Sequence, residues 1–307
     1  MSASKSSAGI TAPGIPTATA RTPRPWRWTP LLQLSMASHL AAGAAALCGG
    51  QARSWALRIL AADHLVLSGA GCLPHSGLLG PVTTRMPPRP DAGSLGLDMA
   101  LSFDDGPDPD VTPRIAELLE ERGLRASFFV IGERVRRHPE VAERLHAAGH
   151  RLENHTDTHP SDFAFSFLPR LGREIGGCQR TVSTVTGRAP AYFRAPAGMR
   201  NPLLEGALAR HGLHLVSWTR RGYDTADGDG ERVLRRLLNG LGSGDIVLLH
   251  DGRAARTPEG GAVSLEVLPR LLDAIEAAGL RAGPLPEPET IGLESSDAAR
   301  PEPRRGS

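Results

Sequence analysis

Short β-like runs alternate with amphipathic, helix-like runs from about residue 95 to residue 283. The β-like runs span 97–103, 126–131, 150–153, 191–194, 213–218 and 245–249, and the helix-like runs span 112–119, 135–148, 168–186, 202–211, 231–241 and 263–278. This alternation predicts a parallel sheet with helices outside it, either an open sheet or a barrel. In a (β/α) barrel the chemistry lies at the carboxyl ends of the strands, so polar residues that follow β-like runs are the candidates for a site.

The composition argues against two broad classes of function. The chain has 35 Lys and Arg against 33 Asp and Glu, so its charge balance gives no reason to expect nucleic acid as a partner. The three cysteines, Cys48, Cys72 and Cys178, include no Cys-x-x-Cys pair and are odd in number. We therefore expect small buried thiols rather than a disulfide framework or a cysteine zinc site.

The amino-terminal region differs from the rest of the chain. Residues 1–25 are rich in Ser, Ala, Thr, Pro and Arg, lack apolar periodicity and are expected to be disordered. Residues 31–48 then form an apolar stretch of 18 residues without a formal charge, only slightly shorter than a membrane span of about 20 residues. The preceding Arg21, Arg24 and Arg27 favour a cytoplasmic amino terminus.

A second apolar stretch, residues 55–74, is a weaker candidate for a membrane span. It contains Arg58, Asp63 and His64, and each charge near the centre of a bilayer costs roughly 2.5–3.5 kcal/mol on insertion scales. Arg58 lies near one end and can extend toward the interface, whereas Asp63 cannot do so easily. One span would put the main domain outside the cytoplasm and two would return it inside, so its side stays open.

The expected domain plan has five parts. They are a disordered amino terminus at 1–25, apolar helices at 26–80, a Pro- and Gly-rich linker at 81–95, the main domain at 96–283 and a disordered tail at 284–307. We expect membrane association through residues 30–74, and the alternative is a pair of soluble helices packed on the main domain.

Two adjacent carboxylates, Asp104 and Asp105, follow the first β-like run and precede Gly106-Pro107. Neighbouring side chains on an extended chain point in opposite directions, but a bend at Gly106-Pro107 lets both approach one site. One carboxylate can then bind a metal ion while the other stays free to accept a proton. The alternative is an acidic turn that caps a helix.

Two histidines, His155 and His159, follow the β-like run that ends at Glu153. They are four residues apart, so both imidazoles would face the same side if the segment is helical. This spacing is frequent in metal sites. Combined with one carboxylate, it gives a ligand set that leaves coordination positions open for water and substrate, as a catalytic metal requires.

Two further strand ends carry polar residues with a chemical use. Arg194, in an Arg-Ala-Pro segment, can hold a carboxylate by two hydrogen bonds and fix its charge state. His250 follows the run at 245–249 and is suited to protonating a departing amine near neutral pH. The alternatives are a surface arginine beside a loop proline and a lone histidine in the core.

Read together and in this order, the four segments resemble the NodB-homology polysaccharide deacetylases, a carbohydrate esterase family of metal-dependent N-deacetylases. The resemblance covers about residues 97–280. Its specific part is the pairing of Phe-Asp-Asp-Gly-Pro with Asn-His-Thr-x-x-His, followed by Arg-x-Pro and Leu-Leu-His. It implies a distorted (β/α) barrel, here with the apolar amino-terminal helices outside it.

The resemblance also implies a role for each residue of the motifs. The ligands of a divalent metal, usually zinc, would be Asp105, His155 and His159. Asp104 would be the general base and His250 the general acid. Arg194 would orient Asp104, and Asp224 would hold His250 in its working tautomer.

The sequence departs from the family pattern at three positions. Ala197 stands where an aromatic residue usually follows Arg-x-Pro, and Arg221 and Thr225 stand where the family ordinarily has an Asp and a Trp. Without these aromatics we do not expect a long groove that stacks a glycan, and a small or lipid-linked sugar fits better.

The predicted function is hydrolysis of the N-acyl group, most simply N-acetyl, of an amino sugar in a polysaccharide or glycoconjugate. The first alternative is a deacylase of a lipid-linked sugar, working at a membrane of the bacterial inner-membrane type. The second is a sugar-binding protein on the same fold that performs no catalysis, which would be favoured if the protein bound no metal.

Overall fold

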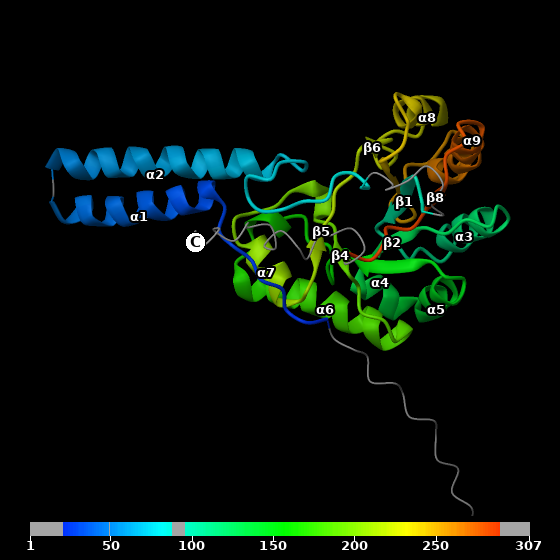
Figure 1. The fold of residues 1–307 in the computed structure, drawn as a ribbon, viewed down its shortest axis with the longest axis horizontal. Helices are drawn as coiled ribbons and strands as arrows, with labels where there is room; N and C mark the ends of the chain where they lie inside the picture. The colour runs from blue at the N-terminus through cyan, green and yellow to red at the C-terminus, as the bar shows by residue number, and fades with distance from the viewer. Residues whose placement is uncertain (1–20, 49, 88–95, 289–307) are drawn as a thin grey trace, which may run out of the picture.

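A parallel sheet forms the centre of this computed structural model, which describes residues 21–48, 50–87 and 96–288 (Figure 1). The described strands are β1 (Met99–Asp104), β2 (Ser127–Val130), β3 (Arg151–Asn154), β4 (Tyr192–Phe193), β5 (His214–Leu215), β6 (Arg220–Arg221), β7 (Ile246–His250) and β8 (Ala282–Gly283). Their order is β5-β4-β3-β2-β1-β7-β6, with β8 beside β1. Every pairing between them is parallel, which confirms the predicted α/β fold of the distorted-barrel type.

Each of the six predicted β-like runs overlaps one of these strands. The sequence did not predict β6 and β8, which are two residues long. Arg-Arg and Ala-Gly have no alternating or apolar pattern, so only their partners in the sheet define them as strands.

The helices of the domain follow the predicted plan with one exception. They are α3 (Thr112–Glu120), α4 (Gly132–Arg137), α5 (Pro139–Ala147), α6 (Leu168–Thr186), α7 (Leu204–Arg210), α8 (Gly230–Leu238) and α9 (Val263–Ala277). The prediction of one helix over 135–148 was wrong, because the chain breaks at His138 between α4 and α5. Pro139 has no N–H to donate, and its ring disfavours a helical conformation at the residue before it.

The main core lies between the central strands and the helices that cover them. Phe103 of β1 stacks on Phe128 of β2 at a ring separation of 5.1 Å, and both are fully buried. Ile115 of α3 and Leu271 of α9 belong to the same cluster. Burial of side chains of this size stabilises the fold by about 1.5–3 kcal/mol each, so β1 is held firmly at the centre of the sheet.

The pairing of β3 with β4, toward one edge of the sheet, is short and is reinforced by a buried carboxylate. β3 and β4 share one register pair, Asn154 with Phe193. The Oε2 atom of Glu153 accepts hydrogen bonds from the backbone N–H groups of Ala191 and Tyr192, at 2.7 and 2.8 Å. Glu153 therefore fixes the start of β4, the strand that leads into the predicted site.

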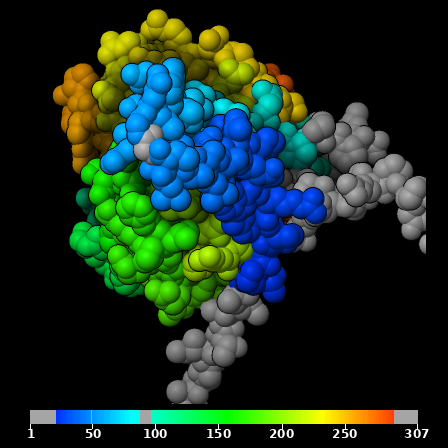
Figure 2. Space-filling view, turned by 90° about the vertical axis from the view of Figure 1, so that its left-hand side faces the viewer, coloured from blue at the N-terminus to red at the C-terminus, as the bar shows by residue number. Residues whose placement is uncertain are grey.

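Two helices, α1 (Pro30–Cys48) and α2 (Gly50–Gly71), form an antiparallel hairpin that projects from the domain (Figure 1). Figure 2 looks at the molecule from the hairpin side, and the blue helices stand in front of the domain. Within the described residues, α1 is the one helix long and apolar enough to cross a membrane, a test that signal sequences also pass. Leu40 and Leu65 are 70% and 75% exposed, so much of the apolar surface of the hairpin is uncovered.

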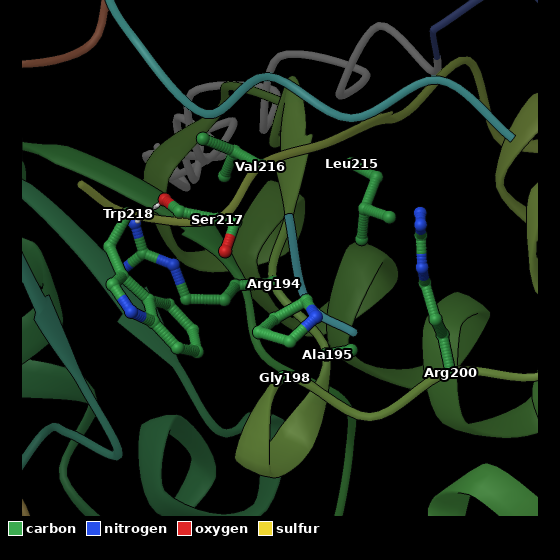
Figure 3. Close-up of a pocket in the computed structure, with 9 residues that line it drawn as sticks. Arg194, Ala195, Gly198, Arg200, Leu215, Val216, Ser217 and Trp218 are labelled. Carbon is green, nitrogen blue, oxygen red and sulfur yellow. Dashed lines mark hydrogen bonds between the residues drawn. The ribbon is translucent and has the colours of Figure 1, made fainter. Parts of the chain in front are cut away.

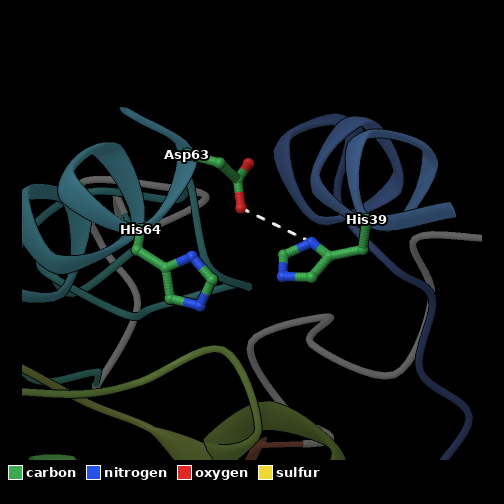
Figure 4. A group of neighbouring side chains, drawn as sticks. All are labelled: His39, Asp63 and His64. Atoms are coloured by element: carbon green, nitrogen blue, oxygen red, sulfur yellow. Dashed lines mark ion pairs between the residues drawn. The ribbon is translucent and has the colours of Figure 1, made fainter. Parts of the chain in front are cut away.

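Asp63, the charge that weakened the second apolar stretch as a span, lies between the two helices (Figure 4). Its Oδ2 atom accepts a hydrogen bond from the Ser35 hydroxyl at 2.8 Å and lies 3.7 Å from Nδ1 of His39. The His64 ring lies 5.1 Å from that of His39. A partner on α1 thus offsets part of the cost of placing this carboxylate in an apolar hairpin.

The hairpin is joined to the domain on both sides. Before α1, the Nε atom of Arg24 donates to the Leu213 carbonyl at 2.8 Å, and its guanidinium pairs with Glu205 at 2.6 Å. At the end of α2, the carbonyl of Gly71 accepts a hydrogen bond from the backbone N–H of Arg200 at 3.1 Å. Both ends of the hairpin are therefore anchored at the same side of the sheet.

Parts of the expected amino terminus, linker and tail lie outside the described residues, namely 1–20, 88–95 and 289–307. Of the expected linker, Thr83 pairs with the sheet edge, because its N–H donates to the Leu215 carbonyl at 2.9 Å. Of the expected tail, Leu285 is fully buried. All three cysteines are free thiols, but the prediction that they are buried was wrong for Cys48 and Cys72, which are exposed.

Candidate active site

The two adjacent carboxylates lie at the carboxyl end of β1, in the middle of the sheet. β1 ends at Asp104, and Asp105 adopts a left-handed conformation with φ of 74°. This reversal turns both carboxylates toward the same pocket. Gly106 is required here, because a Cβ atom at this position would lie 1.9 Å from the Asp251 carboxylate.

His155 and His159 lie in a loop after β3, so the helical arrangement considered for them was wrong. The backbone instead turns through left-handed conformations at Thr156 and His159, with φ of 69° and 54°. The loop brings the two imidazole rings to 5.0 Å from each other. Glu174 of α6 secures the loop by accepting hydrogen bonds from the N–H groups of residues 157 and 158, at 3.1 and 2.9 Å.

Asp105, His155 and His159 direct their side chains at one point. Oδ1 of Asp105 lies 3.4 Å from Nε2 of His155 and 3.2 Å from Nε2 of His159. This oxygen is buried and has no hydrogen-bond partner among the described residues. Nδ1 of His155 lies 2.8 Å from the Arg194 carbonyl, and donation to that carbonyl leaves Nε2 with a free lone pair.

A buried carboxylate with no partner, facing two imidazoles, fits a divalent cation. Two nitrogens and one oxygen are a donor set that zinc and related ions accept. His159 has a further contact, because Nη1 of Arg253 lies 2.9 Å from its Nδ1 atom. Arginine can only donate, so in this conformation Nδ1 of His159 is the acceptor.

Arg194 and Asp104 form a buried ion pair beside this cluster. Nη1 of Arg194 donates to Oδ1 of Asp104 at 2.6 Å, and Nη2 donates to the Ser217 carbonyl at 3.0 Å. The guanidinium also lies over the Phe129 ring, 4.0 Å from its centroid. An arginine held on several sides fixes the position and orientation of the Asp104 carboxylate.

His250 ends β7, the strand next to β1, and its register partner is Asp104. Asp224 is fully buried and contacts both the backbone and the ring of His250. Its Oδ2 atom accepts from the His250 backbone N–H at 2.7 Å, and its Oδ1 atom lies 2.8 Å from Nδ1 of the ring. Because Nδ1 faces a carboxylate, it carries the proton, and Nε2 is left for the pocket.

The charges in the pocket shift the titration of its members. Burial raises the pKa of Asp105, but the neighbouring imidazoles outweigh it and hold that pKa well below its usual range. Burial lowers the pKa of His159 to about 4, with repulsion from His155 adding to the effect. Burial also opposes protonation of His250, yet the hydrogen bond and charge of Asp224 prevail and raise its pKa.

These groups line a pocket with a volume of about 320 Å³. The pocket is also lined by Ala197, Trp218, Arg221, Thr225 and Arg253. A much smaller cavity of about 10 Å³, enough for one water, lies behind Arg194 and Trp218 (Figure 3). The structure thus brings every residue predicted for the site to one pocket or directly behind it.

Comparison with known proteins agrees with this geometry. The family model described as polysaccharide deacetylase matches residues 96–216. A chitooligosaccharide deacetylase of Bradyrhizobium sp. (strain ANU 289) is 32% identical over 194 residues, which are 61% of this chain and 88% of the relative. A peptidoglycan-N-acetylglucosamine deacetylase of Bacillus cereus is 33% identical over 175 residues, 56% of this chain and 81% of the relative.

The chain belongs to the polysaccharide deacetylase family. Among solved structures, the family 4 carbohydrate esterase from Streptomyces lividans in complex with acetate is 27% identical, with a TM-score of 0.57. The likeness covers 64% of this chain and 97% of the esterase. The amino-terminal hairpin and the segment after it precede the matched part of the family model.

Sequence reasoning missed two residues of this deacetylase-family site. Arg253 lines the pocket and contacts His159, and Glu174 holds the histidine loop. Arg253 follows the His-Asp-Gly segment at a strand end, and this position could have identified it as a residue of the site. Glu174 lies on a helix 15 residues after His159, and nothing in its spacing pointed to the site.

Replacement of Asp224 by Asn should lower the pKa of His250. The carboxylate stabilises the imidazolium, and without its charge the burial of His250 favours the neutral ring. NMR titration of His250 in the metal-free protein measures this change. Asp227→Asn is the matched control, since Asp227 pairs with Arg232 at 2.8 Å outside the pocket. Equal His250 titration in Asp224→Asn and in the unaltered protein would contradict the account.

Proposed function

We propose that this chain is a metal-dependent hydrolase that removes the N-acetyl group from an amino sugar. The observation that carries the proposal is the convergence of Asp105, His155 and His159 beside two buried pairs, Arg194–Asp104 and His250–Asp224. The relatives named chitooligosaccharide deacetylase and peptidoglycan-N-acetylglucosamine deacetylase support this reaction and an N-acetylated sugar as substrate.

Asp105, His155 and His159 would hold a divalent cation, for which zinc is the natural candidate by donor type. A bound cation would act as a Lewis acid on the amide carbonyl and lower the pKa of the attacking water. Ligation through Nε2 of His159 requires the proton on Nδ1, which then can no longer accept from Arg253. Metal binding would therefore free the Arg253 side chain.

Asp104 would act as the general base. It lies beside the metal ligands but is not one of them, and Arg194 keeps its carboxylate oriented. It would take the proton from water as the oxygen attacks the carbonyl carbon. An acceptor that is already fixed in position needs no rearrangement at that moment, which favours the attack.

His250 would act as the general acid on the other side of the scissile bond. Its protonated form is favoured by Asp224, and Nε2 is left to donate toward the pocket. When the carbon–nitrogen bond breaks, this proton passes to the departing nitrogen. The products are acetate and the free amino sugar. The hydroxyl group of water is added to the acetyl carbon, and one hydrogen is added to the nitrogen.

Replacement of Asp104 by Asn should leave metal content near normal and reduce turnover by about 10²–10⁴-fold, the usual effect of losing an acid–base group. Acetate release and metal analysis on the same preparation measure both. Asp110→Asn, an exposed position in the same loop, serves as the control. Thermal unfolding would exclude a folding defect, and unchanged turnover in a folded, metal-loaded protein would refute the role.

A second candidate is a deacylase that works on a lipid-linked amino sugar. The exposed apolar hairpin favours it, as does the absence of the usual aromatics at Ala197 and Thr225. In this reading both helices insert, and the Asp63–Ser35 contact keeps the one acidic group of α2 partnered. Because the hairpin returns, the amino terminus and the domain would then lie on the same side.

Replacement of Leu34 and Leu40 by Lys should separate the two candidates. These side chains are 65% and 70% exposed, so the charges should weaken insertion without disturbing the domain. If the substrate is lipid-linked, binding to lipid vesicles and deacylation of a vesicle-embedded amino sugar should fall together, while hydrolysis of soluble chito-oligomers stays unchanged. Glu143→Lys on the domain surface is the control, and retained vesicle binding in the double variant would contradict the anchor.

A further inference from the structure

Arg221 on β6 is an arginine that the fold does not neutralise. Its guanidinium lies 5.0 Å from the Trp218 ring and 4.9 Å from the Tyr223 ring, so aromatic faces hold it in place. Within the described chain no hydrogen bond or ion pair to the Arg221 side chain is found, and its Nε atom is buried without a partner. A cation fixed at the wall of a pocket without an anion is available to a ligand.

The net charge of the whole pocket also favours an anionic ligand. On its surface, Asp104 and Asp105 balance Arg221 and Arg253. Behind it, the buried charges of Arg194 and Asp224 balance each other. The divalent cation of the proposed function would therefore give this pocket of about 320 Å³ a net positive charge. A neutral sugar does not use this excess, whereas a substrate with an anionic group does.

The pocket wall that carries Arg221 is also where the hairpin joins the domain. The ring of His75, in the segment that leaves α2, packs edge-on against Trp218 at 5.6 Å. Pro74 and Trp218 close around Gly198, because a Cβ atom there would lie 3.0 Å from Pro74 and 2.6 Å from Trp218. The arginine and the base of the apolar hairpin thus share one aromatic side chain.

We infer that Arg221 is the subsite for a phosphate ester on the amino sugar that this enzyme deacetylates. A guanidinium can bind two phosphate oxygens at once, and Trp218 and Tyr223 hold it ready to do so. The inference rests on the proposed function and names the substrate class, an N-acetylated amino-sugar phosphate. The phosphate can be that of a free sugar phosphate or the link to a lipid.

The test compares acetate release from N-acetylglucosamine 1-phosphate with release from the neutral methyl glycoside of N-acetylglucosamine, using the full-length, metal-loaded protein. The unaltered protein should prefer the phosphate in kcat/KM by about 10-fold or more. Arg221→Gln should lose about 10–100-fold on the phosphate, mainly through KM, and change less than about 3-fold on the neutral glycoside. Arg221→Lys should recover part of the loss, because lysine restores the positive charge but not the planar guanidinium that binds two phosphate oxygens.

Arg236→Gln is the matched control, since Arg236 reaches the same Tyr223 ring at 5.9 Å but pairs with Asp227 outside the pocket. A third arm uses N-acetylglucosamine linked by phosphate to a long alkyl chain, in mixed micelles. A higher kcat/KM in this arm assigns the phosphate to a lipid-linked sugar, and an equal value assigns it to the free sugar phosphate.

An equal loss on charged and neutral substrates in Arg221→Gln, or no preference for the phosphate in the unaltered protein, would overturn the subsite and leave the deacetylase proposal intact. Isothermal titration calorimetry of the product glucosamine 1-phosphate gives a second readout. The Arg221→Gln variant should bind this product more weakly than the Arg236→Gln variant. Failure to release acetate from any of the substrates would instead count against the proposed function itself.

Discussion

Two carboxylates side by side at the end of a buried strand determine much of the chemistry around them. Asp104 and Asp105 follow one another at the end of β1, and burial makes their negative charges costly unless each has a partner. The partner of Asp104 is Arg194, whereas Asp105 faces His155 and His159. The first pair is complete within the protein, and the second group would be completed by a cation.

The parallel register explains how residues far apart in the chain reach this point. The carboxyl ends of β1, β3, β4 and β7 lie at one end of the sheet, and each delivers part of the site. Asp104 and His250 are direct register partners, so the base and the acid of the proposed mechanism lie on adjacent strands. The short β3–β4 pairing depends on Glu153, which links the histidine loop to the strand before Arg194.

Sequence patterns predicted where six of the strands lie along the chain and which motif residues meet in the pocket, because apolar runs and polar strand ends are local signals. They could not predict the loop at 155–160, where left-handed residues replace the helix that the histidine spacing suggested. Nor could they show that Asp63 meets Ser35 across the hairpin, or that Arg221 stays without an anion. Each of these features depends on contacts between different segments of the chain, and such contacts leave no local pattern in the sequence.

The most direct measurement is X-ray anomalous scattering at the zinc edge from crystals of the protein grown with zinc. The account predicts one strong peak within coordination distance of Asp105, His155 and His159, at about 2.0–2.2 Å from their ligand atoms. His39, Asp63 and His64 in the hairpin form a second group of potential ligands and provide an internal comparison. Zinc bound at that group while the pocket showed no peak would contradict the central claim.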